Sequence, residues 1–199
     1  MQKRNTQQRR RAIIECLNTN GEVVVDELAR ELIKDHNRII IDSGSTTSAL
    51  LPLLKSKIGL VVMTNSLQVS NYLLEQENEP KVLMTGGSWD TQSHSFQGKM
   101  AELVLRSYNF DQAFLGAAGL DLAQGTTTFN ELTQLSKVMA EVSNQVIVMA
   151  ESEKLQRKIP NVELPWQSIS ILVTDDLISI EAKQSIEKHG VAVICAKTL

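Results

Sequence analysis

The sequence predicts an α/β fold built on a mainly parallel sheet with helices on both faces. From Arg38 onward, short apolar runs recur along the chain, and several of them end abruptly in small or polar residues. Such unbroken runs, in place of alternating apolar and polar residues, are typical of strands covered on both faces. Stretches with helical spacing separate the runs, as expected for the crossovers of a parallel sheet.

The segment before this pattern has the features of two helices. Residues 7–18 place apolar side chains on one face, and Gly21 lies in the C-cap region where such a helix ends. Residues 23–25 form a short extended run of valines. Asp26 is a good N-cap for a second helix, which we expect over residues 26–36.

Seven apolar runs are the expected strands, and five stretches between them are the expected helices. The strands are expected at residues 39–41, 60–63, 82–84, 113–115, 146–150, 171–173 and 191–195. The helices are expected at residues 47–55, 67–75, 100–107, 131–143 and 180–189. Pro52 lies inside the first of these helices and predicts a kink or a short helix there.

Composition excludes several classes of protein. The chain has 199 residues, of which 42% are hydrophobic and 22% are charged, and these values argue against disorder. No apolar run is long enough to span a membrane, and the N-terminus lacks the apolar region of a signal peptide. Cys16 and Cys195 are too few for a disulfide framework. We therefore expect a cytoplasmic protein of one domain with a short additional piece.

Charge is distributed unevenly along the chain. Residues 1–11 carry five of the 20 basic residues and no acid, which leaves 15 basic and 23 acidic residues, a net charge of −8, in the rest. A basic end on an acidic body is one way to bind an anion such as nucleic acid. A solvated terminus without a partner is the simpler explanation, and charge alone leaves both open.

The segment that follows the first expected strand is suited to a phosphate. Gly44 lets the backbone approach an anion closely, and Ser45, Thr46 and Thr47 supply hydroxyls beside free N–H groups at a helix start. Asp42 precedes them. The segment lacks the Gly-Lys-Ser/Thr of a nucleotide-binding loop, so a monophosphate or another small phosphorylated ligand fits better. A helix cap without a ligand is the alternative.

Other polar residues are harder to assign. Lys154 follows an expected strand, where it could neutralise a phosphate or pair with a neighbouring glutamate. Glu131 begins an expected helix, so it could act as a cap or accept hydrogen bonds from sugar hydroxyls. The histidines, His36, His94 and His189, lack metal-ligand spacing, and we expect neither a metal nor a cofactor.

Taken together and in order, these motifs resemble the DeoR family of bacterial sugar-catabolism repressors. The resemblance covers roughly residues 29–196 and rests on IIIDSGSTT (39–47), VMTNS (62–66), VLMTGG (82–87), SFQGKMAE (95–102), FDQAFLGAAGLD (110–121), GTTTFNE (125–131), AESEK (150–154) and LVTDD (172–176). Within the family, residues 136–162 are similar to regulators of polyol and amino-sugar operons, such as those for glucitol and galactitol.

The resemblance implies a sensor domain related to ribose-5-phosphate isomerase that binds a phosphorylated sugar or polyol as inducer. The residues that it places at this site are Asp42, Gly44, Ser45, Thr46, Thr47, Thr64, Asn65, Gly86, Gly87, Glu131 and Lys154. The family usually has an acid where this chain has Ala117 and Ala118, and alanine cannot transfer a proton, so we expect no enzyme. The usual Asp-Ser-Ser-Lys is here residues 151–154, Glu-Ser-Glu-Lys, and the added Glu153 either narrows ligand choice or points to solvent.

The N-terminus resembles the family only in part. Residues 9–30 are similar to the first helix, short strand and second helix of a winged helix-turn-helix, but no recognition helix or wing follows. We therefore expect a partial DNA-binding segment at 1–30 and a sensor domain at 31–199. Arg9, Arg10 and Arg11 would contact DNA phosphates and give only weak, non-specific operator binding.

The whole chain is accordingly expected to be a sugar or polyol operon repressor with impaired operator binding. Because operators of this family are repeated, we expect a homo-oligomer, either a dimer or a tetramer. A stand-alone sugar-phosphate sensor subunit and a sugar-phosphate isomerase are the alternatives.

Overall fold

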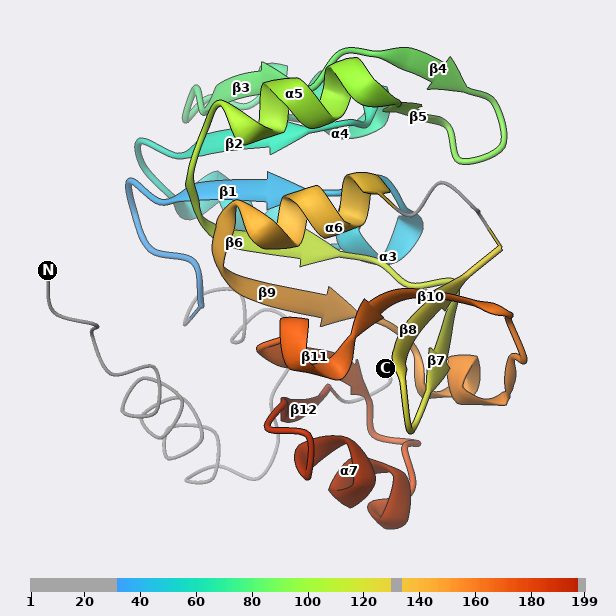
Figure 1. The fold of residues 1–199 in the computed structure, drawn as a ribbon. Coiled ribbons are helices and arrows are strands. Elements are labelled where there is room, and N and C mark those ends of the chain that lie inside the picture. Colours follow the sequence, from blue (N-terminus) through green and yellow to red (C-terminus); the bar gives the residue numbers. More distant parts are fainter. Residues whose placement is uncertain (1–31, 130–133, 197–199) are drawn as a thin grey trace, which may run out of the picture.

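A seven-stranded, wholly parallel sheet forms the centre of the molecule (Figure 1). The computed structural model describes residues 32–129 and 134–196. From one edge to the other the strands are β12 (Ala192–Ala196), β11 (Ile171–Asp175), β9 (Ser143–Met149), β6 (Phe110–Leu115), β1 (Arg38–Ile41), β2 (Val61–Thr64) and β3 (Lys81–Met84). Each of the seven apolar runs forms one of these strands, so the predicted sheet is confirmed.

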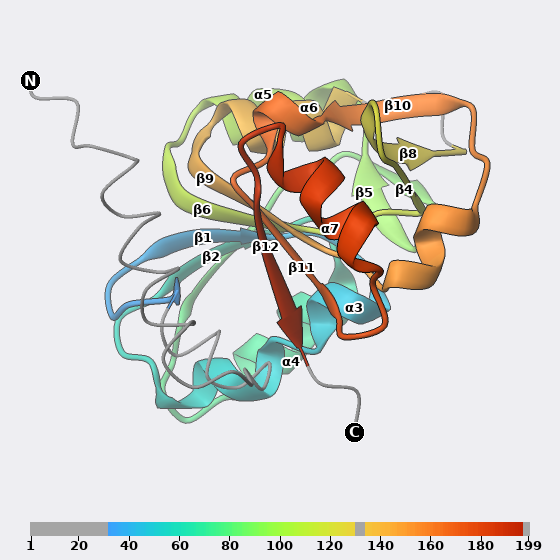
Figure 2. The same cartoon turned by 90° about the horizontal axis from the view of Figure 1, so that it is seen from below.

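Helices cover both faces of the sheet, as Figure 2 shows from below. One face carries α3 (Ser45–Ser48), the 3-10 helix η1 (Leu51–Ser56) and α4 (Leu67–Leu74), and the other carries α5 (Lys99–Arg106), α6 (Gln134–Glu141) and α7 (Ile180–Glu187). The expected helix at 47–55 is divided into α3 and η1, and Pro52 lies in the first turn of η1. The proline therefore shortens the helix as predicted.

The strands consist of unbroken apolar runs because an apolar core lies on each face of the sheet. Along β1, Ile39 and Ile41 pack on the α4 side of the sheet, while Ile40 packs on the α5 and α6 side. All three side chains are fully buried. Because successive side chains point to opposite faces of a strand, a strand between two cores favours apolar side chains at most positions away from its ends.

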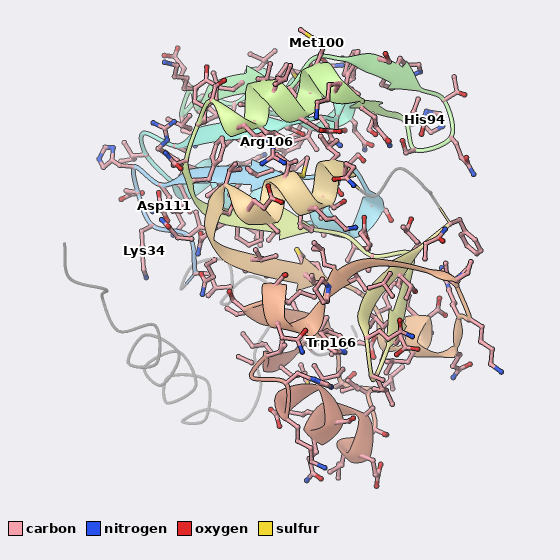
Figure 3. The ribbon with its side chains drawn as sticks, viewed as in Figure 1. Lys34, His94, Met100, Arg106, Asp111 and Trp166 are labelled. Carbon is pink, nitrogen blue, oxygen red and sulfur yellow. The ribbon has the colours of Figure 1, made fainter. Side chains whose placement is uncertain are left out.

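Two smaller sheets flank the large one. An antiparallel sheet contains β10 (Asn161–Pro165), β8 (Gly125–Thr128) and β7 (Gly119–Asp121), and a hairpin pairs β4 (Ser88–Asp90) with β5 (Ser95–Gln97). Trp166, in the short 3-10 helix η3 (Trp166–Ser168), is fully buried, and its indole N–H donates to the Asp121 carbonyl at 2.9 Å (Figure 3). This contact fastens the small sheet to the main core.

The helix expected over residues 26–36 ends earlier than predicted. The helical geometry stops at Leu32, and a turn follows, in which the Asn37 side chain accepts from the Lys34 N–H at 2.8 Å. Ile33 is fully buried in the core below the sheet, and the Asp35 carboxylate accepts from the Ile58 N–H at 2.9 Å. Burial of this segment competes with helix continuation. The expected segment at 1–30 lies outside the described residues.

Other expectations concern the whole chain. No helix among the described residues has the length and apolar composition that crossing a bilayer requires. The expected helix at 131–143 is described from Gln134 and ends at Glu141, and β9 begins two residues later.

The two tryptophans give a matched test of the packing. We expect Trp166→Phe to lower the free energy of unfolding by about 1–3 kcal/mol, because it removes the indole N–H that donates to the Asp121 and Leu122 carbonyls and reduces the volume of a fully buried side chain. Trp89, which is 42% exposed, is the control, and Trp89→Phe should change the free energy by less than ~0.5 kcal/mol. Urea unfolding followed by circular dichroism measures both, and equal losses would contradict this assignment.

Candidate functional site

The predicted site lies at the edge of the sheet where the parallel strands have their carboxyl ends. The order of strands reverses at β1, because β2 pairs with one side of it and β6 with the other. Such a switch point leaves an opening between the diverging loops and is the usual ligand position in open α/β sheets. The loop that follows β1 begins with Asp42, so the segment predicted to bind a phosphate lies at this position (Figure 1).

A clamp formed by Asn65 joins the ends of β1 and β2. Its amide N–H donates to the Asp42 carboxylate at 2.9 Å, and its carbonyl oxygen accepts from the Ser43 N–H at 3.0 Å. Asn65 itself is 2% exposed. Two of the predicted site residues, 23 positions apart in the sequence, are thus in direct contact. Their contact fixes the start of the loop that follows β1.

Within the loop, the hydroxyl residues have different roles. Gly44 has φ 144° and ψ 155°, a backbone conformation that favours glycine. The buried Thr47 hydroxyl lies 2.8 Å from the Asp42 carbonyl and 3.0 Å from the Gly44 carbonyl, and therefore holds the loop together. Ser45 is exposed and Thr46 is half-buried. Neither of the latter two residues is buried, in contrast to Thr47.

Thr64, Gly86 and Gly87 lie at the ends of β2 and β3. The Thr64 hydroxyl is buried and accepts from the Ser66 N–H at 3.1 Å, so it supports the turn into α4. Gly87 has φ 108°, and a Cβ there would lie 2.5 Å from the Gln97 carbonyl. Gly86 has φ 60° and nothing within 4 Å of such a Cβ. A side chain at position 87 would therefore collide with the backbone of β5, whereas the space beside Gly86 is open.

Lys154 is a buried cation at the same edge of the sheet. It lies in the 3-10 helix η2 (Ser152–Gln156), is 8% exposed, and has its Nζ 3.7 Å from a carboxylate oxygen of Glu151. Glu153 points away and pairs with Arg157 at 2.6 Å, and both side chains are about half-exposed or more. Of the two roles considered for Glu153, contact with solvent is therefore the one observed.

The structure adds Glu163, which the sequence analysis did not select. This carboxylate on β10 accepts from the Ser136 hydroxyl at 2.6 Å and from the Thr126 hydroxyl at 3.4 Å. Burial raises its pKa to about 7 against the Ser136 hydrogen bond, and the negative charge of Asp42 raises the pKa further. Burial also raises the pKa of Asp42 to about 6, against the hydrogen bond from Asn65. The pKa values of two carboxyls are thus raised, and the charge of Asp42 acts on Glu163.

Two groups of predicted residues lie outside this description. Glu131 belongs to the undescribed residues 130–133, and Arg9, Arg10 and Arg11 belong to 1–31. Their predicted roles in effector and DNA binding are therefore not assessed by the geometry. Among the described residues, no group of three His, Cys, Asp or Glu side chains has the arrangement of a metal site.

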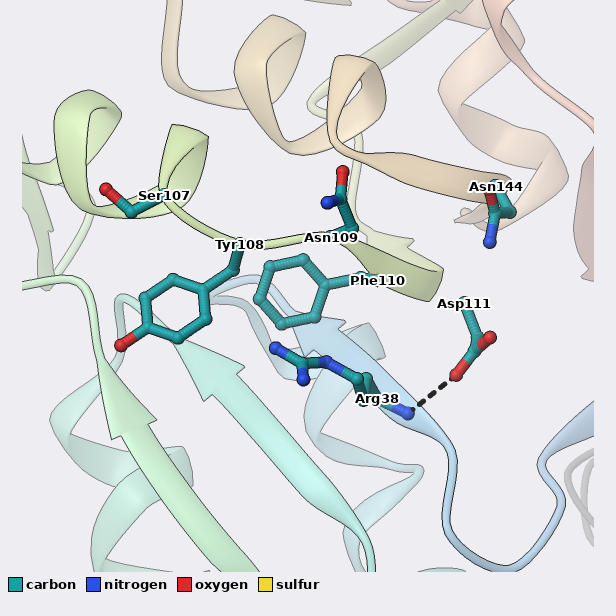
Figure 4. Close-up of a pocket in the computed structure, with 7 residues that line it drawn as sticks. All are labelled: Arg38, Ser107, Tyr108, Asn109, Phe110, Asp111 and Asn144. Atoms are coloured by element: carbon teal, nitrogen blue, oxygen red, sulfur yellow. Dashed lines mark hydrogen bonds between the residues drawn. The ribbon is translucent and has the colours of Figure 1, made fainter.

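A separate hollow of about 410 Å³ lies at the opposite edge of the sheet, where β1 and β6 begin (Figure 4). The Arg38 guanidinium stands over the rings of Tyr108 and Phe110, 5.9 and 5.8 Å from their centroids. The backbone N–H of Arg38 donates to the Asp111 carboxylate at 2.9 Å. This hollow shares no residue with the predicted site, and its arginine is already stacked on aromatic rings.

Comparisons with known proteins agree with the motifs. Residues 23–176 match the DeoR C terminal sensor domain. A putative aga operon transcriptional repressor of Escherichia coli O157:H7 is 38% identical over 180 residues, which cover 90% of this chain and 66% of the repressor. The HTH-type transcriptional regulator GlpR of Haloferax volcanii is 28% identical over 181 residues, 90% of this chain and 70% of that regulator. The chain thus spans about two thirds of the length of these relatives.

Similarity to solved structures is lower. Ribose 5-phosphate isomerase A from Methanocaldococcus jannaschii aligns with a TM-score of 0.46 and 17% identity, over 65% of this chain and 50% of the isomerase. A likeness at this level carries no argument about activity.

The raised pKa of Glu163 predicts a pH-dependent stability. Because the folded state holds this proton more tightly than the unfolded state, the free energy of unfolding falls as pH rises from about 4.5 to about 7. Glu163→Gln removes the ionisation. It should leave stability at pH 4.5 nearly unchanged and raise it at pH 8 by about 1–3 kcal/mol.

Urea unfolding at the two pH values measures this difference, with the exposed Glu77→Gln as the control variant. The same effect of Glu163→Gln at both pH values would show that ionisation of this carboxyl is not involved.

Proposed function

The chain belongs to the DeoR family, and on this premise we propose that it is a transcriptional repressor of a sugar or polyol operon that responds to a phosphorylated sugar or polyol. Relatives named as transcriptional regulators support this reading. We place the effector at the carboxyl edge of the sheet, where the strand order reverses.

The observation that carries the proposal is the buried cation at this edge. A lysine that is almost fully buried normally requires an opposite charge close to it. Among the described residues, the acid that contacts Lys154 is Glu151, at 3.7 Å, and its side chain is 55% exposed. A phosphate that binds Lys154 would supply the stronger counter-charge. The hydroxyls of Ser45 and Thr46 and the open backbone at Gly44 would donate to the same anion.

The carbon chain of the effector would lie against the carboxyl groups. Carboxylate oxygens accept hydrogen bonds from hydroxyls, and the charge of Asp42, at the end of β1, acts on the carboxyl group of Glu163. Asn65 holds Asp42 in place and would set its direction. Glu131, which the family resemblance assigns to the effector, and the open backbone at Gly86 complete the proposed site.

We propose that the protein senses the effector and does not catalyse a reaction on it. Ala117 and Ala118, between β6 and β7, provide no group that could move a proton. Weak contact with DNA, without recognition of a specific sequence, belongs to the same proposal, with Arg9, Arg10 and Arg11 as contacts to DNA phosphates. We further propose a homo-oligomer, a dimer or a tetramer, since repeated operators favour repeated subunits.

A thermal-shift screen tests the effector. Phosphorylated sugars and polyols are each compared with their unphosphorylated forms. A ligand at ~100 times its Kd adds roughly 2.7 kcal/mol and should raise Tm by about 5–10 °C in a protein of this size. Lys154→Ala should abolish the shift, whereas Lys158→Ala, which removes the same charge from an exposed residue nearby, should preserve it. The absence of a shift with every phosphate would refute the proposed effector class.

Operator binding is tested by gel shift over a range of salt concentrations. We expect this chain to bind DNA weakly and without sequence preference. The logarithm of its affinity should fall with the logarithm of salt concentration with a slope of about −3, since three arginines contact phosphates. Replacing Arg9, Arg10 and Arg11 with alanine should remove the binding. Nanomolar, sequence-specific binding by this chain would contradict the expectation.

A further inference from the structure

The carboxylate of Asp175, at the carboxyl end of β11, connects two neighbouring loops. One oxygen accepts from the Ser152 N–H at 2.7 Å, and the other accepts from the Ser152 hydroxyl at 2.5 Å. The second oxygen also accepts from the Leu177 N–H at 3.0 Å. Although partial burial raises the pKa of Asp175, these hydrogen bonds outweigh it and hold the pKa below its ordinary value. The group is therefore a carboxylate with both oxygens engaged.

This carboxylate accepts from the first N–H of the helix η2, which lacks a side-chain cap of its own. Glu151 is its N-cap residue, and the Glu151 side chain makes no capping hydrogen bond. The N–H of Ser152 is the first donor of the helix, and Asp175 from the neighbouring strand accepts from it. A 3-10 helix of five residues has little stability by itself, so its position is set by contacts from outside.

Lys154 stands two residues after Ser152 in this helix. Its backbone N–H donates to the Glu151 carbonyl at 3.1 Å, so Lys154 belongs to the same helical turn as Ser152. A rotation of η2 about its first residue would move the buried ammonium group. We propose that Asp175 is a positioning residue that holds η2, and through it Lys154, in place for the phosphate of the effector. This inference rests on the proposed function.

Whether substitution of Asp175 weakens or tightens anion binding distinguishes a positioning role from simple electrostatic repulsion. Asp175→Asn removes a negative charge near the site, which by Coulomb attraction alone would tighten the binding of an anion. It also places an amide N–H against a donor of Ser152, so a positioning role predicts weaker binding. Asp176→Asn removes the same charge from the adjacent exposed residue and should leave anion binding unchanged or slightly stronger.

The experiment is a titration with inorganic phosphate at constant ionic strength, followed by phosphorus NMR line width, with Tm measured for each variant. We expect Asp175→Asn to weaken phosphate binding about tenfold, which is the effect of losing one charged hydrogen bond. In the Lys154→Ala background, Asp175→Asn should have no further effect on phosphate binding, although its effect on Tm should remain.

Ser152 variants keep the inference testable if Asp175→Asn does not fold. Ser152→Ala loses one of the two bonds to Asp175 and should weaken phosphate binding a few-fold, while Ser152→Thr retains the hydroxyl and should restore it. A folded Asp175→Asn that lowers Tm but binds phosphate as the wild type does would overturn the positioning role alone. If the wild type binds no phosphate, or if Lys154→Ala leaves binding intact, the proposed function fails as well.

Discussion

Burial on both faces is the constraint that governs the central sheet. Fully buried strands such as β1 favour apolar side chains along their length, because each side chain enters one core or the other. Polar and charged groups are therefore concentrated towards the strand ends, and a polar residue inside a strand, such as Gln112 of β6, needs hydrogen bonds to its side chain. In a wholly parallel sheet the carboxyl ends of the strands share one edge, and Asp42, Asn65 and Lys154 follow strands that end there. The site that we propose is a consequence of the way in which the sheet is buried.

The same constraint explains which elements could be predicted. Apolar runs identified all seven strands of the large sheet, and Pro52 correctly indicated the division of the first helix. The strands of the small sheets were missed because they are short and polar. For instance, β8 contains three consecutive threonines and pairs with β10, more than 30 residues later in the chain. The early end of the helix at Leu32 depends on burial of Ile33, which local sequence does not reveal.

The sequence indicated which strand ends carry the candidate residues, but not how each side chain is used. The motifs identified the DeoR family, and the comparisons confirm it. Which hydroxyl is exposed and which one holds the loop depends on the three-dimensional path of residues 42–47, and only the structure distinguishes Thr47 from Ser45. Glu163 gave no signal, because a lone acid in a short strand normally faces solvent. The roles of Glu131 and of Arg9, Arg10 and Arg11 stay predictions.

The position of β1 in the sheet has a consequence for synthesis of the chain. β1 pairs on one side with β2, which follows it closely, and on the other side with β6, and the contact between Arg38 and Asp111 spans 73 residues. While the chain leaves the ribosome, β1, β2 and β3 can associate early, but one edge of β1 has no partner until β6 has emerged. An apolar strand with an unpaired edge is a template for pairing with another chain. The nascent protein therefore passes through an interval in which the strand at its future centre requires protection from aggregation.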